Sequence, residues 1–294
     1  MFIETRKLGK KKKYYLVHSY RKKDKVNRIS RYLGSDLSKK ELEKLRKRAE
    51  LLILEQLKDT FEHELSKDEI NEYWKFESKI DLEHLQRGIN WLRFTEEFTY
   101  NTNAIEGSAV EFSEVRKLIE KKDSPQNHEE TETLGVAEAI EYVKNTKDKL
   151  YLKLIKKLHF LCFKDSKHFA GEFRNVEVVI TDGHGQIVHR GAPAKEVEKL
   201  LKNLVRQYNK HEKKYPPLLL AALTHNHFEN IHPFQDGNGR VGRLLINYVL
   251  LKHNYPPLNI RLKDRMQYYN VLQEFERTGN INPTLRFLKS QYKK

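Results

Sequence analysis

The chain has 294 residues, and 56 Lys and Arg against 41 Asp and Glu give it a formal net charge of +15. No run of the sequence approaches the ~18 apolar residues of a membrane-spanning helix, and the N-terminal stretch MFIETRKLGKKKK lacks the apolar segment of a secretory signal. A single cysteine, Cys162, excludes an internal disulfide framework and a zinc site built on several thiolates. We therefore expect a globular protein of the cytoplasm, with no membrane as partner.

The positive charge is concentrated at the N-terminus. Residues 1–50 contain 18 Lys and Arg but 6 Asp and Glu, a net charge of +12, so the remainder is nearly neutral. A basic module of this kind can attract nucleic acid or acidic proteins. A lysine-rich surface that only aids solubility produces the same pattern, and the sequence leaves both interpretations open.

Residues 1–36 are predicted to form a basic β-hairpin module. The segment 14–20, YYLVHSY, is rich in residues that favour strands, and the segment 26–33, VNRISRYL, alternates apolar and polar side chains. The polar residues 21–25 between them are typical of a turn.

Most of the remaining sequence has helical periodicity. Ser38 with Glu41 and Ser66 with Glu69 fit capping boxes, each ahead of an amphipathic stretch, the second of which continues to Trp91. We predict a helical region over residues 37–130 and a core over 131–294. Within them we expect a polar loop at 121–129 and helices at 133–144, 150–163 and 218–229.

One segment interrupts the helical pattern. The β-branched run 177–181 is followed by Asp-Gly-His-Gly and then by 186–189, which predicts a small β-hairpin.

The most informative stretch is 232–243, HPFQDGNGRVGR. Pro233 ends the preceding helix, the two glycines of residues 236–239 allow a tight turn, and the helical pattern then resumes. The free amide groups at the start of the second helix are a ready binding site for an anion. The turn therefore predicts a phosphate-binding loop.

The side chains around this turn suit phosphoryl or nucleotidyl transfer. Arg240 and Arg243 lie one helical turn apart and can reach the same anion. Asp236 is a carboxylate where Mg²⁺ would bridge protein and phosphate. His232 is the nearby group suited to act as a general base at neutral pH.

Three other interpretations of the histidines are possible. His225, Glu229 and His232 have a spacing that could serve zinc, although Pro233 breaks the helix there. His225 and His227 more simply pack or form hydrogen bonds within the helix. The HPF sequence alone could also be no more than a helix cap.

Residues 232–243 resemble the signature HxFx[D/E]GNGRxxR of the Fic (Fido) family, with every fixed position filled. Members with this version typically transfer AMP from ATP to a Ser, Thr or Tyr hydroxyl of a protein. A related group that phosphorylates its target has other residues in place of the two glycines, so Gly237 and Gly239 favour adenylylation. The resemblance covers roughly residues 82–288. It implies a mainly α fold, a Fic-type helical bundle with a small β-hairpin flap.

The resemblance also implies a set of roles within this loop. His232 takes the proton of the target hydroxyl, Asp236 holds Mg²⁺, and Arg243 fixes the γ-phosphate of ATP. The residues implied in ATP and phosphate binding are Asp236, Gly237, Asn238, Gly239, Arg240, Val241, Gly242 and Arg243.

Residues 102–107, TNAIEG, look like the family's inhibitory motif [S/T]xxxE[G/N], here on the N-terminal side of the catalytic loop. Thr102, Glu106 and Gly107 fill its fixed positions. The resemblance implies that Glu106 pairs with Arg243. Because an Arg–carboxylate pair is strong when partly buried, Arg243 would then not hold the γ-phosphate, and the enzyme would be autoinhibited.

Residues 171–174, GEFR, and the hairpin after them resemble the family's flap, which is expected to bind the target backbone by strand addition. The residues implied to line the adenine pocket are Ile180, Thr181, Asp182, Gly183, Tyr268 and Tyr269. The aromatic contact with adenine is assigned to Tyr269. Glu276 stands where the family is expected to have an asparagine.

We therefore expect a protein adenylyltransferase that uses ATP and Mg²⁺ and modifies a target protein, possible targets including itself, and it could form a homodimer. One alternative is the reverse activity, in which Glu106 orients a water to remove AMP from a modified protein. Another is a regulator that binds nucleic acid or protein through its basic N-terminus, with the Fic core as a ligand sensor.

Overall fold

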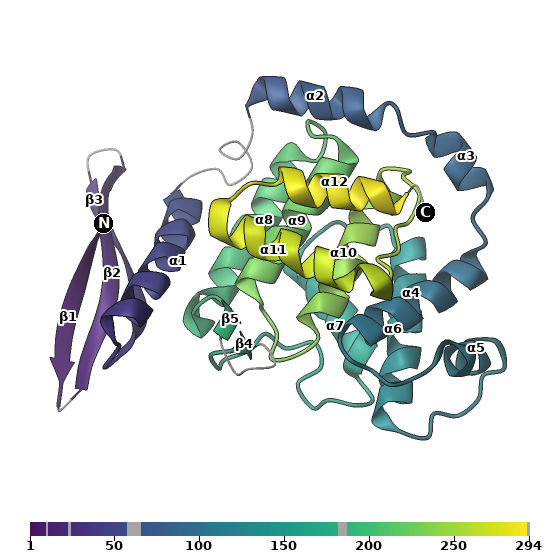
Figure 1. The fold of residues 1–294 in the computed structure, drawn as a ribbon, viewed down its shortest axis with the longest axis horizontal. Helices are drawn as coiled ribbons and strands as arrows, with labels where there is room; N and C mark the ends of the chain where they lie inside the picture. The colour runs from purple at the N-terminus through teal and green to yellow at the C-terminus, as the bar shows by residue number, and fades with distance from the viewer. Residues whose placement is uncertain (10, 23–24, 58–65, 182–186, 293–294) are drawn as a thin grey trace. The chain divides into compact units, whose positions relative to one another are not determined.

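The computed structural model describes residues 1–9, 11–22, 25–57, 66–181 and 187–292 (Figure 1). The chain is mostly helical with short antiparallel strands, as predicted. It divides into two compact units, residues 1–63 and 64–294. None of the helices in these ranges is both long and apolar enough to cross a membrane.

The first unit contains the predicted hairpin and one strand that we did not predict. Strands β2 (Lys11–Lys22) and β3 (Lys25–Ser35) pair antiparallel, and β1 (Phe2–Leu8) pairs with the other edge of β2. The sequence of β1 alternates polar and apolar residues only weakly, so its conformation depends on pairing with β2. The result is a three-stranded sheet rather than a hairpin.

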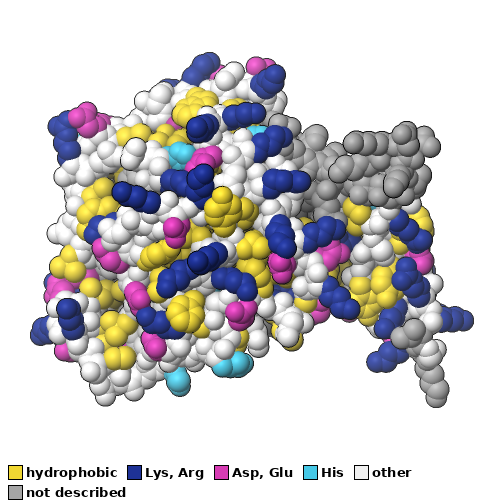
Figure 2. All heavy atoms as spheres, turned by 180° about the vertical axis from the view of Figure 1, so that it is seen from behind, with side chains coloured by type: hydrophobic (Ala, Val, Ile, Leu, Met, Phe, Trp, Pro, Cys, Tyr) yellow, Lys and Arg dark blue, Asp and Glu magenta, His cyan; other side chains and the backbone are white. Residues whose placement is uncertain are grey.

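Helix α1 (Lys39–Leu57) packs on this sheet, so the unit extends beyond the module predicted for residues 1–36. Leu16 and Leu33 of the sheet contact Ala49 and Ile53 of the helix in a small apolar core. The Ser38 capping box is formed, because the Glu41 amide donates to Ser38 Oγ and the Ser38 amide to the Glu41 carboxylate. Figure 2 shows Lys and Arg side chains along this unit.

The second unit is a helical bundle with one small hairpin. Its helices, in chain order, are α2 (Lys67–Glu77), α3 (Leu82–Arg87), α4 (Trp91–Ile105), α5 (Phe112–Glu120), α6 (His128–Asn145), α7 (Leu152–Phe163), α8 (Val197–His211), α9 (Pro217–Ile231), α10 (Asn238–Lys252), α11 (Arg265–Thr278) and α12 (Asn282–Gln291), with short 3-10 helices η1 (Ala194–Glu196) and η2 (Leu262–Asp264). The hairpin pairs β4 (Val179–Thr181) with β5 (Ile187–Arg190).

Two helix boundaries differ from those expected. The continuous amphipathic stretch predicted from Ser66 to Trp91 is divided into three helices, because Asp81 and Asn90 cap new helix starts at α3 and α4. Helix α6 begins at His128, five residues before the predicted start, because Asn127 caps it by accepting from the Glu130 amide. In both cases a capping side chain set the boundary.

Helices α9 and α10 form the centre of the second unit (Figure 1). The first twelve residues of α9 are all buried, consistent with the apolar sequence PLLLAAL at its start. Around the pair lie α4, α6, α7, α8, α11 and α12. The loop between α9 and α10 carries the motif at 232–243, so its backbone is held at both ends by buried helices.

Candidate active site

The loop between α9 and α10 has two residues in the left-handed region. His232 ends α9 with a φ of 52°, and Gly237 precedes α10 with a φ of 78°. A Cβ at Gly237 would overlap the ring of Phe163, so the turn needs glycine for both conformation and space. No side chain caps the start of α10, and its first amide groups therefore remain available to an anion.

The side chain of Asn238 holds the loop closed. Its Oδ1 accepts from the Phe234 amide at 2.8 Å, and its Nδ2 donates to the Phe234 carbonyl at 2.9 Å. The side chain is buried and engaged within the loop, so Asn238 can offer a phosphate only its backbone amide. Val241, also in the predicted ATP-binding stretch, is buried in the core.

Arg174 fixes the backbone at His232, a function that the sequence analysis did not assign to it. Its Nε donates to the His232 carbonyl at 2.7 Å, and its backbone amide donates to the Pro233 carbonyl at 2.9 Å. Its guanidinium also donates to the carbonyls of Ala192 and Val176, on either side of the hairpin. The GEFR segment therefore joins the hairpin to the loop. The resemblance to the flap was the signal that could have identified it.

His232 lies between the hairpin and a buried carboxylate. Its Nδ1 is 4.0 Å from Oε2 of Glu229, and its ring centroid is 5.2 Å from that of His189 on β5. Glu276 pairs with His189 at 2.8 Å. The residue that departs from the family pattern thus contacts the hairpin beside the predicted base.

A chain of buried polar groups continues from Glu229 toward Arg243. His225 Nδ1 is 4.0 Å from Glu229, and His225 Nε2 is 2.9 Å from the Tyr268 hydroxyl. Burial raises the pKa of Glu229 to about 8, and burial together with Arg243 lowers the pKa of His225 to about 3. At neutral pH both groups are therefore mainly uncharged.

Arg243 is held by several oxygen atoms. Its Nη2 lies 2.6 Å from Glu106 Oε1 and 2.9 Å from the Thr102 carbonyl, and its Nε donates to Thr102 Oγ1 at 2.6 Å. The side chain of Arg243 is 2% exposed and that of Glu106 is 33% exposed. Although burial opposes the charge, Glu106 keeps the pKa of Arg243 above its usual value. The structure thus places Glu106 against the arginine that the resemblance implied.

The residues around Glu106 allow its carboxylate to reach Arg243. A Cβ at Gly239 would overlap the Glu106 carboxylate, so the small residue leaves room for it. Gly107 follows Glu106 with a φ of 97° and turns the chain away from α4. Glu129 of α6 accepts from Ser108 Oγ and from the Ala109 amide, which fixes the segment after this turn.

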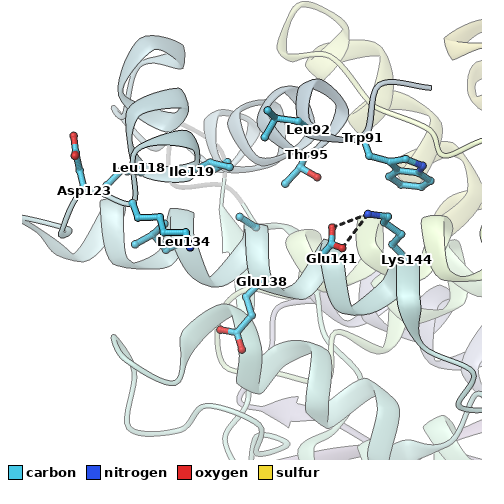
Figure 3. A pocket seen from close by; sticks show the side chains of 12 residues that line it. Trp91, Leu92, Thr95, Leu118, Ile119, Asp123, Leu134, Glu138, Glu141 and Lys144 are labelled. Carbon is cyan, nitrogen blue, oxygen red and sulfur yellow. Dashed lines mark hydrogen bonds and ion pairs between the residues drawn. The ribbon is translucent and has the colours of Figure 1, made fainter. Parts of the chain in front are cut away.

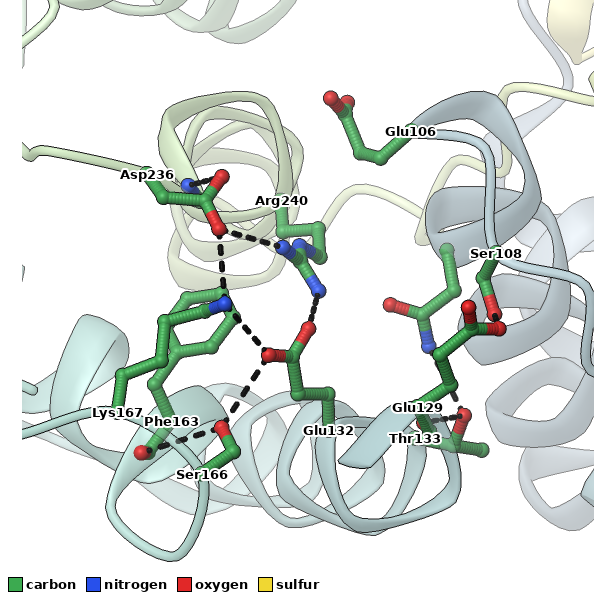
Figure 4. Close-up of polar contacts among 12 residues, drawn as sticks. Glu106, Ser108, Glu129, Glu132, Thr133, Phe163, Ser166, Lys167, Asp236 and Arg240 are labelled. Atoms are coloured by element: carbon green, nitrogen blue, oxygen red, sulfur yellow. Dashed lines mark hydrogen bonds and ion pairs between the residues drawn. The ribbon is translucent and has the colours of Figure 1, made fainter. Parts of the chain in front are cut away.

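A second ionic cluster surrounds Arg240 (Figure 4). Glu132 of α6 pairs with Arg240 and, at 2.8 Å, with Lys167. Lys167 also lies 2.9 Å from Asp236, whose other oxygen accepts from the Gly237 amide at 2.6 Å. Neither Glu132 nor Lys167 was identified from the sequence, because no motif marks a carboxylate and an ammonium 35 positions apart.

The charges of this cluster stabilise one another. Burial raises the pKa of both carboxyl groups, but Arg240 and Lys167 outweigh it, so Glu132 and Asp236 have pKa values below the usual range. Burial lowers the pKa of Lys167, but Glu132 and Asp236 reverse this effect and raise it. Glu132, Asp236 and Lys167 are therefore ionised at neutral pH.

The residues predicted to contact adenine are not all brought together. Tyr268 is buried behind Arg243, with its hydroxyl 3.5 Å from Nη1. Tyr269 is half-buried and donates to the Ile105 carbonyl at 3.0 Å. Ile180 is exposed on β4, and Thr181 ends that strand. Asp182 and Gly183 lie outside the described residues.

The donors at this site fit magnesium rather than zinc. In the described ranges no three His, Cys, Asp or Glu side chains are grouped to hold a metal ion. Asp236 is 52% exposed at the edge of the loop. One such carboxylate, completed by phosphate oxygens and water, is a common environment for Mg²⁺.

A separate hollow of about 640 Å³ lies between α4, α5 and α6 (Figure 3). Trp91, Leu92 and Leu134 give it an apolar wall, and Glu141 and Lys144 form an ion pair at its rim. No residue of the catalytic loop lines it.

The loop lies within a stretch of the chain that matches the model of a known family. Residues 149–250 match the model of the Fic/DOC family. The chain is 32% identical over 199 residues to the protein adenylyltransferase Fic of Nematostella vectensis, an alignment that covers 64% of this chain and 45% of that protein. It is 33% identical over 198 residues to the protein of the same name from Drosophila ananassae, covering 64% and 38%.

The fold has relatives among solved structures. A Fic domain-containing signaling protein from Bacteroides thetaiotaomicron superposes with a TM-score of 0.63 at 25% identity, over 76% of this chain and 91% of that one. Fic-1 from C. elegans superposes with a TM-score of 0.62 at 22% identity, over 87% and 76%, and supports the fold alone. The chain spans less than half the length of the two curated relatives above.

Proposed function

The chain contains a domain of the Fic/DOC family, and from this premise we propose that the protein is a protein adenylyltransferase. It transfers AMP from ATP to a Ser, Thr or Tyr hydroxyl of a target protein. The observation that carries the proposal is the loop at 232–243. It joins a histidine in a fixed left-handed conformation to an uncapped helix start with two arginines.

His232 acts as the general base. Its Nδ1 edge faces Glu229, so the Nε2 edge takes the proton from the target hydroxyl. The hydroxyl oxygen forms a bond to the α-phosphorus of ATP, and the bond from that phosphorus to the oxygen that bridges to the β-phosphate breaks. Pyrophosphate leaves with the electron pair of the broken bond. Arg174 supports this step by holding the carbonyl of His232 in place.

The phosphates lie at the start of α10. The backbone amides of Asn238, Gly239 and Arg240 face them, and the two arginines neutralise their charge. Asp236 would hold Mg²⁺, which, when bound, neutralises the polyphosphate and favours departure of pyrophosphate.

Glu106 inhibits the enzyme. While its carboxylate pairs with Arg243, the γ-phosphate lacks that contact, and the α-phosphorus is misaligned for attack. The 33% exposure of Glu106 supports this role, because a partly exposed carboxylate can leave the pair without unfolding the core.

The test is labelling of the purified protein with ATP carrying label at the α- or the γ-phosphate, in the presence of Mg²⁺. Wild type, Glu106→Gly and the double variant Glu106→Gly/His232→Ala are compared. We expect α-label on the protein, strong in Glu106→Gly and absent in the double variant, with all three chains folded by circular dichroism. Label from the γ-position would instead identify a kinase.

If the protein removes AMP instead, Glu106→Gly is expected to lower its activity rather than raise it. If Glu106 orients a water to remove AMP, Glu106→Gly abolishes release of AMP from a pre-adenylylated protein. Loss of AMP release in Glu106→Gly, together with no self-labelling, would replace the proposed transferase by a hydrolase.

A further inference from the structure

Lys167 places an ammonium group at the edge of the catalytic loop. Its Nζ is 2.8 Å from Glu132 Oε1 and 2.9 Å from Asp236 Oδ2 (Figure 4). The side chain is 22% exposed, and the backbone amide of Lys167 donates to the Phe163 carbonyl at 2.9 Å, which fixes the turn after α7. A cation on a fixed backbone therefore reaches the carboxylate next to the predicted phosphate position.

Lys167 and Arg240 share one aromatic surface. The ring of Phe163 is buried, with Lys167 Nζ 5.5 Å and Arg240 Cζ 4.4 Å from its centroid. The same ring excludes a Cβ at Gly237. Cation–π attraction keeps both charges near the loop, so the two cations and the turn are organised by a single side chain.

The cluster is electrically balanced in the structure. The charges of Lys167 and Arg240 are cancelled by those of Glu132 and Asp236. The two carboxylates differ in access to solvent, because the Asp236 side chain is 52% exposed and that of Glu132 is 13% exposed. Asp236 is thus the partner that can turn away from Lys167, whereas Glu132 stays in place.

We propose that Lys167 is a polyphosphate-binding residue of this site, and that Glu132 is a positioning residue that keeps Lys167 and Arg240 beside the loop. The inference rests on the proposed function, since it takes the triphosphate of ATP as the ligand. The Lys167 ammonium exchanges the Asp236 carboxylate for phosphate oxygens, for which a compact, strongly charged donor is well suited.

The chain offers a matched control in Lys164. It lies three positions earlier, at the end of α7, and its Nζ is 2.6 Å from Glu138 Oε2, a carboxylate outside the loop at 232–243. Lys164→Met removes the same charge as Lys167→Met from a neighbouring position. A general effect of net charge on anion binding is therefore the same in both variants.

The experiment is calorimetric titration of the full chain with ATP, tripolyphosphate and adenosine, in EDTA and again with Mg²⁺. All variants are made in the Glu106→Gly background, so that the inhibitory pair does not mask the phosphate site. We expect Lys167→Met to weaken binding of ATP and tripolyphosphate about tenfold or more, as for a lost charge-assisted hydrogen bond. Adenosine binding stays unchanged, Lys164→Met stays within about twofold of the parent, and Lys167→Arg retains part of the affinity.

Three results would overturn the inference, and they differ from one another. Equal ATP affinity in Lys167→Met and Lys164→Met shows that Lys167 does not bind phosphate. Equal loss of adenosine and ATP affinity in Lys167→Met shows a structural role only. A folded parent that binds no ATP removes the proposed function together with the inference, whereas the first two results leave that function intact.

Discussion

Arg243 and Arg240 lie one turn apart on α10, and each pairs with a carboxylate from another helix, yet their surroundings differ. Arg243 is 2% exposed and keeps two contacts with Thr102 besides its pair with Glu106. Arg240 pairs with Glu132, which at the same time holds Lys167.

The difference shows which carboxylate can leave. Without Glu106, Arg243 still has the hydroxyl and carbonyl of Thr102, and the carboxylate that leaves is 33% exposed. Without Glu132, Lys167 and Arg240 both lose a shared carboxylate at once, and that carboxylate is 13% exposed. Under the proposed function, the first pair is therefore the reversible contact and the second the permanent support.

The largest expected effect is a contrast between these two carboxylates. Glu106→Gly should raise self-adenylylation about tenfold or more, because Arg243 becomes available to the γ-phosphate. Glu132→Gln should lower it by a similar factor, because an amide cannot hold the two cations in place. Incorporation of α-labelled ATP measures both rates.

Glu138→Gln is the control for this contrast, since Glu138 lies on α6 like Glu132 but pairs with Lys164, outside the loop at 232–243. Its rate should stay near that of wild type. If Glu106→Gly and Glu132→Gln changed the rate of self-adenylylation in the same direction, the Glu106–Arg243 and Glu132–Arg240 pairs would have the same role.

A smaller effect is expected when the fixed contacts of Arg243 are removed. Thr102→Val deletes a buried hydroxyl that accepts from Arg243 and should lower the free energy of unfolding by about 1–3 kcal/mol. Ser166→Ala deletes a hydroxyl 3.2 Å from Glu132 in the more open cluster and should cost less than about 0.5 kcal/mol. Urea unfolding followed by circular dichroism measures both, and equal losses would contradict the difference in burial.

A separate prediction concerns the pH dependence of stability and Glu229, the other carboxyl group near Arg243. Burial raises its pKa to about 8, so the folded protein keeps a proton that the unfolded chain loses near its ordinary value of 4.5. The stability contributed by this group is therefore present at low pH and is lost as the pH rises toward 8. The melting temperature of wild type should fall relative to Glu229→Gln between pH 5 and 8.

Titrating groups that do not contact Glu229, such as the buried Glu77, contribute equally to both proteins and cancel in this difference. If the melting temperatures of wild type and Glu229→Gln changed with pH in parallel, Glu229 would be ionised in the folded state. In that case Arg243 would have two nearby carboxylates, Glu229 and Glu106, and the contrast between Arg243 and Arg240 would weaken.

The sequence predicted the backbone conformation of the loop at 232–243 well because its information is local. Pro233 ends one helix, Gly237 makes the turn, and the next helix resumes at once, so three neighbouring signals agree. The capping boxes at Ser38 and Ser66 formed for the same reason.

Elements that depend on distant partners were harder to predict. Strand β1 exists because β2 offers an edge, and its own sequence is weakly alternating. The stretch after Ser66 has a continuous helical period, but Asp81 and Asn90 capped new helices within it. A single sequence shows the propensity of each residue and not which of two competing local structures the packing selects.

Interactions between neighbouring residues specify the loop at 232–243, the basic N-terminal segment of the chain and the mainly helical fold, so the sequence shows all three. Which side chains meet at the loop depends on how the helices pack. Lys167, Glu132 and Arg174 come from segments far from the loop in the chain, and only the packing of α6, α7 and the hairpin segment around α10 brings their charges to it. Charges interact through space, so the residues that complete the site become visible only when the helices are packed.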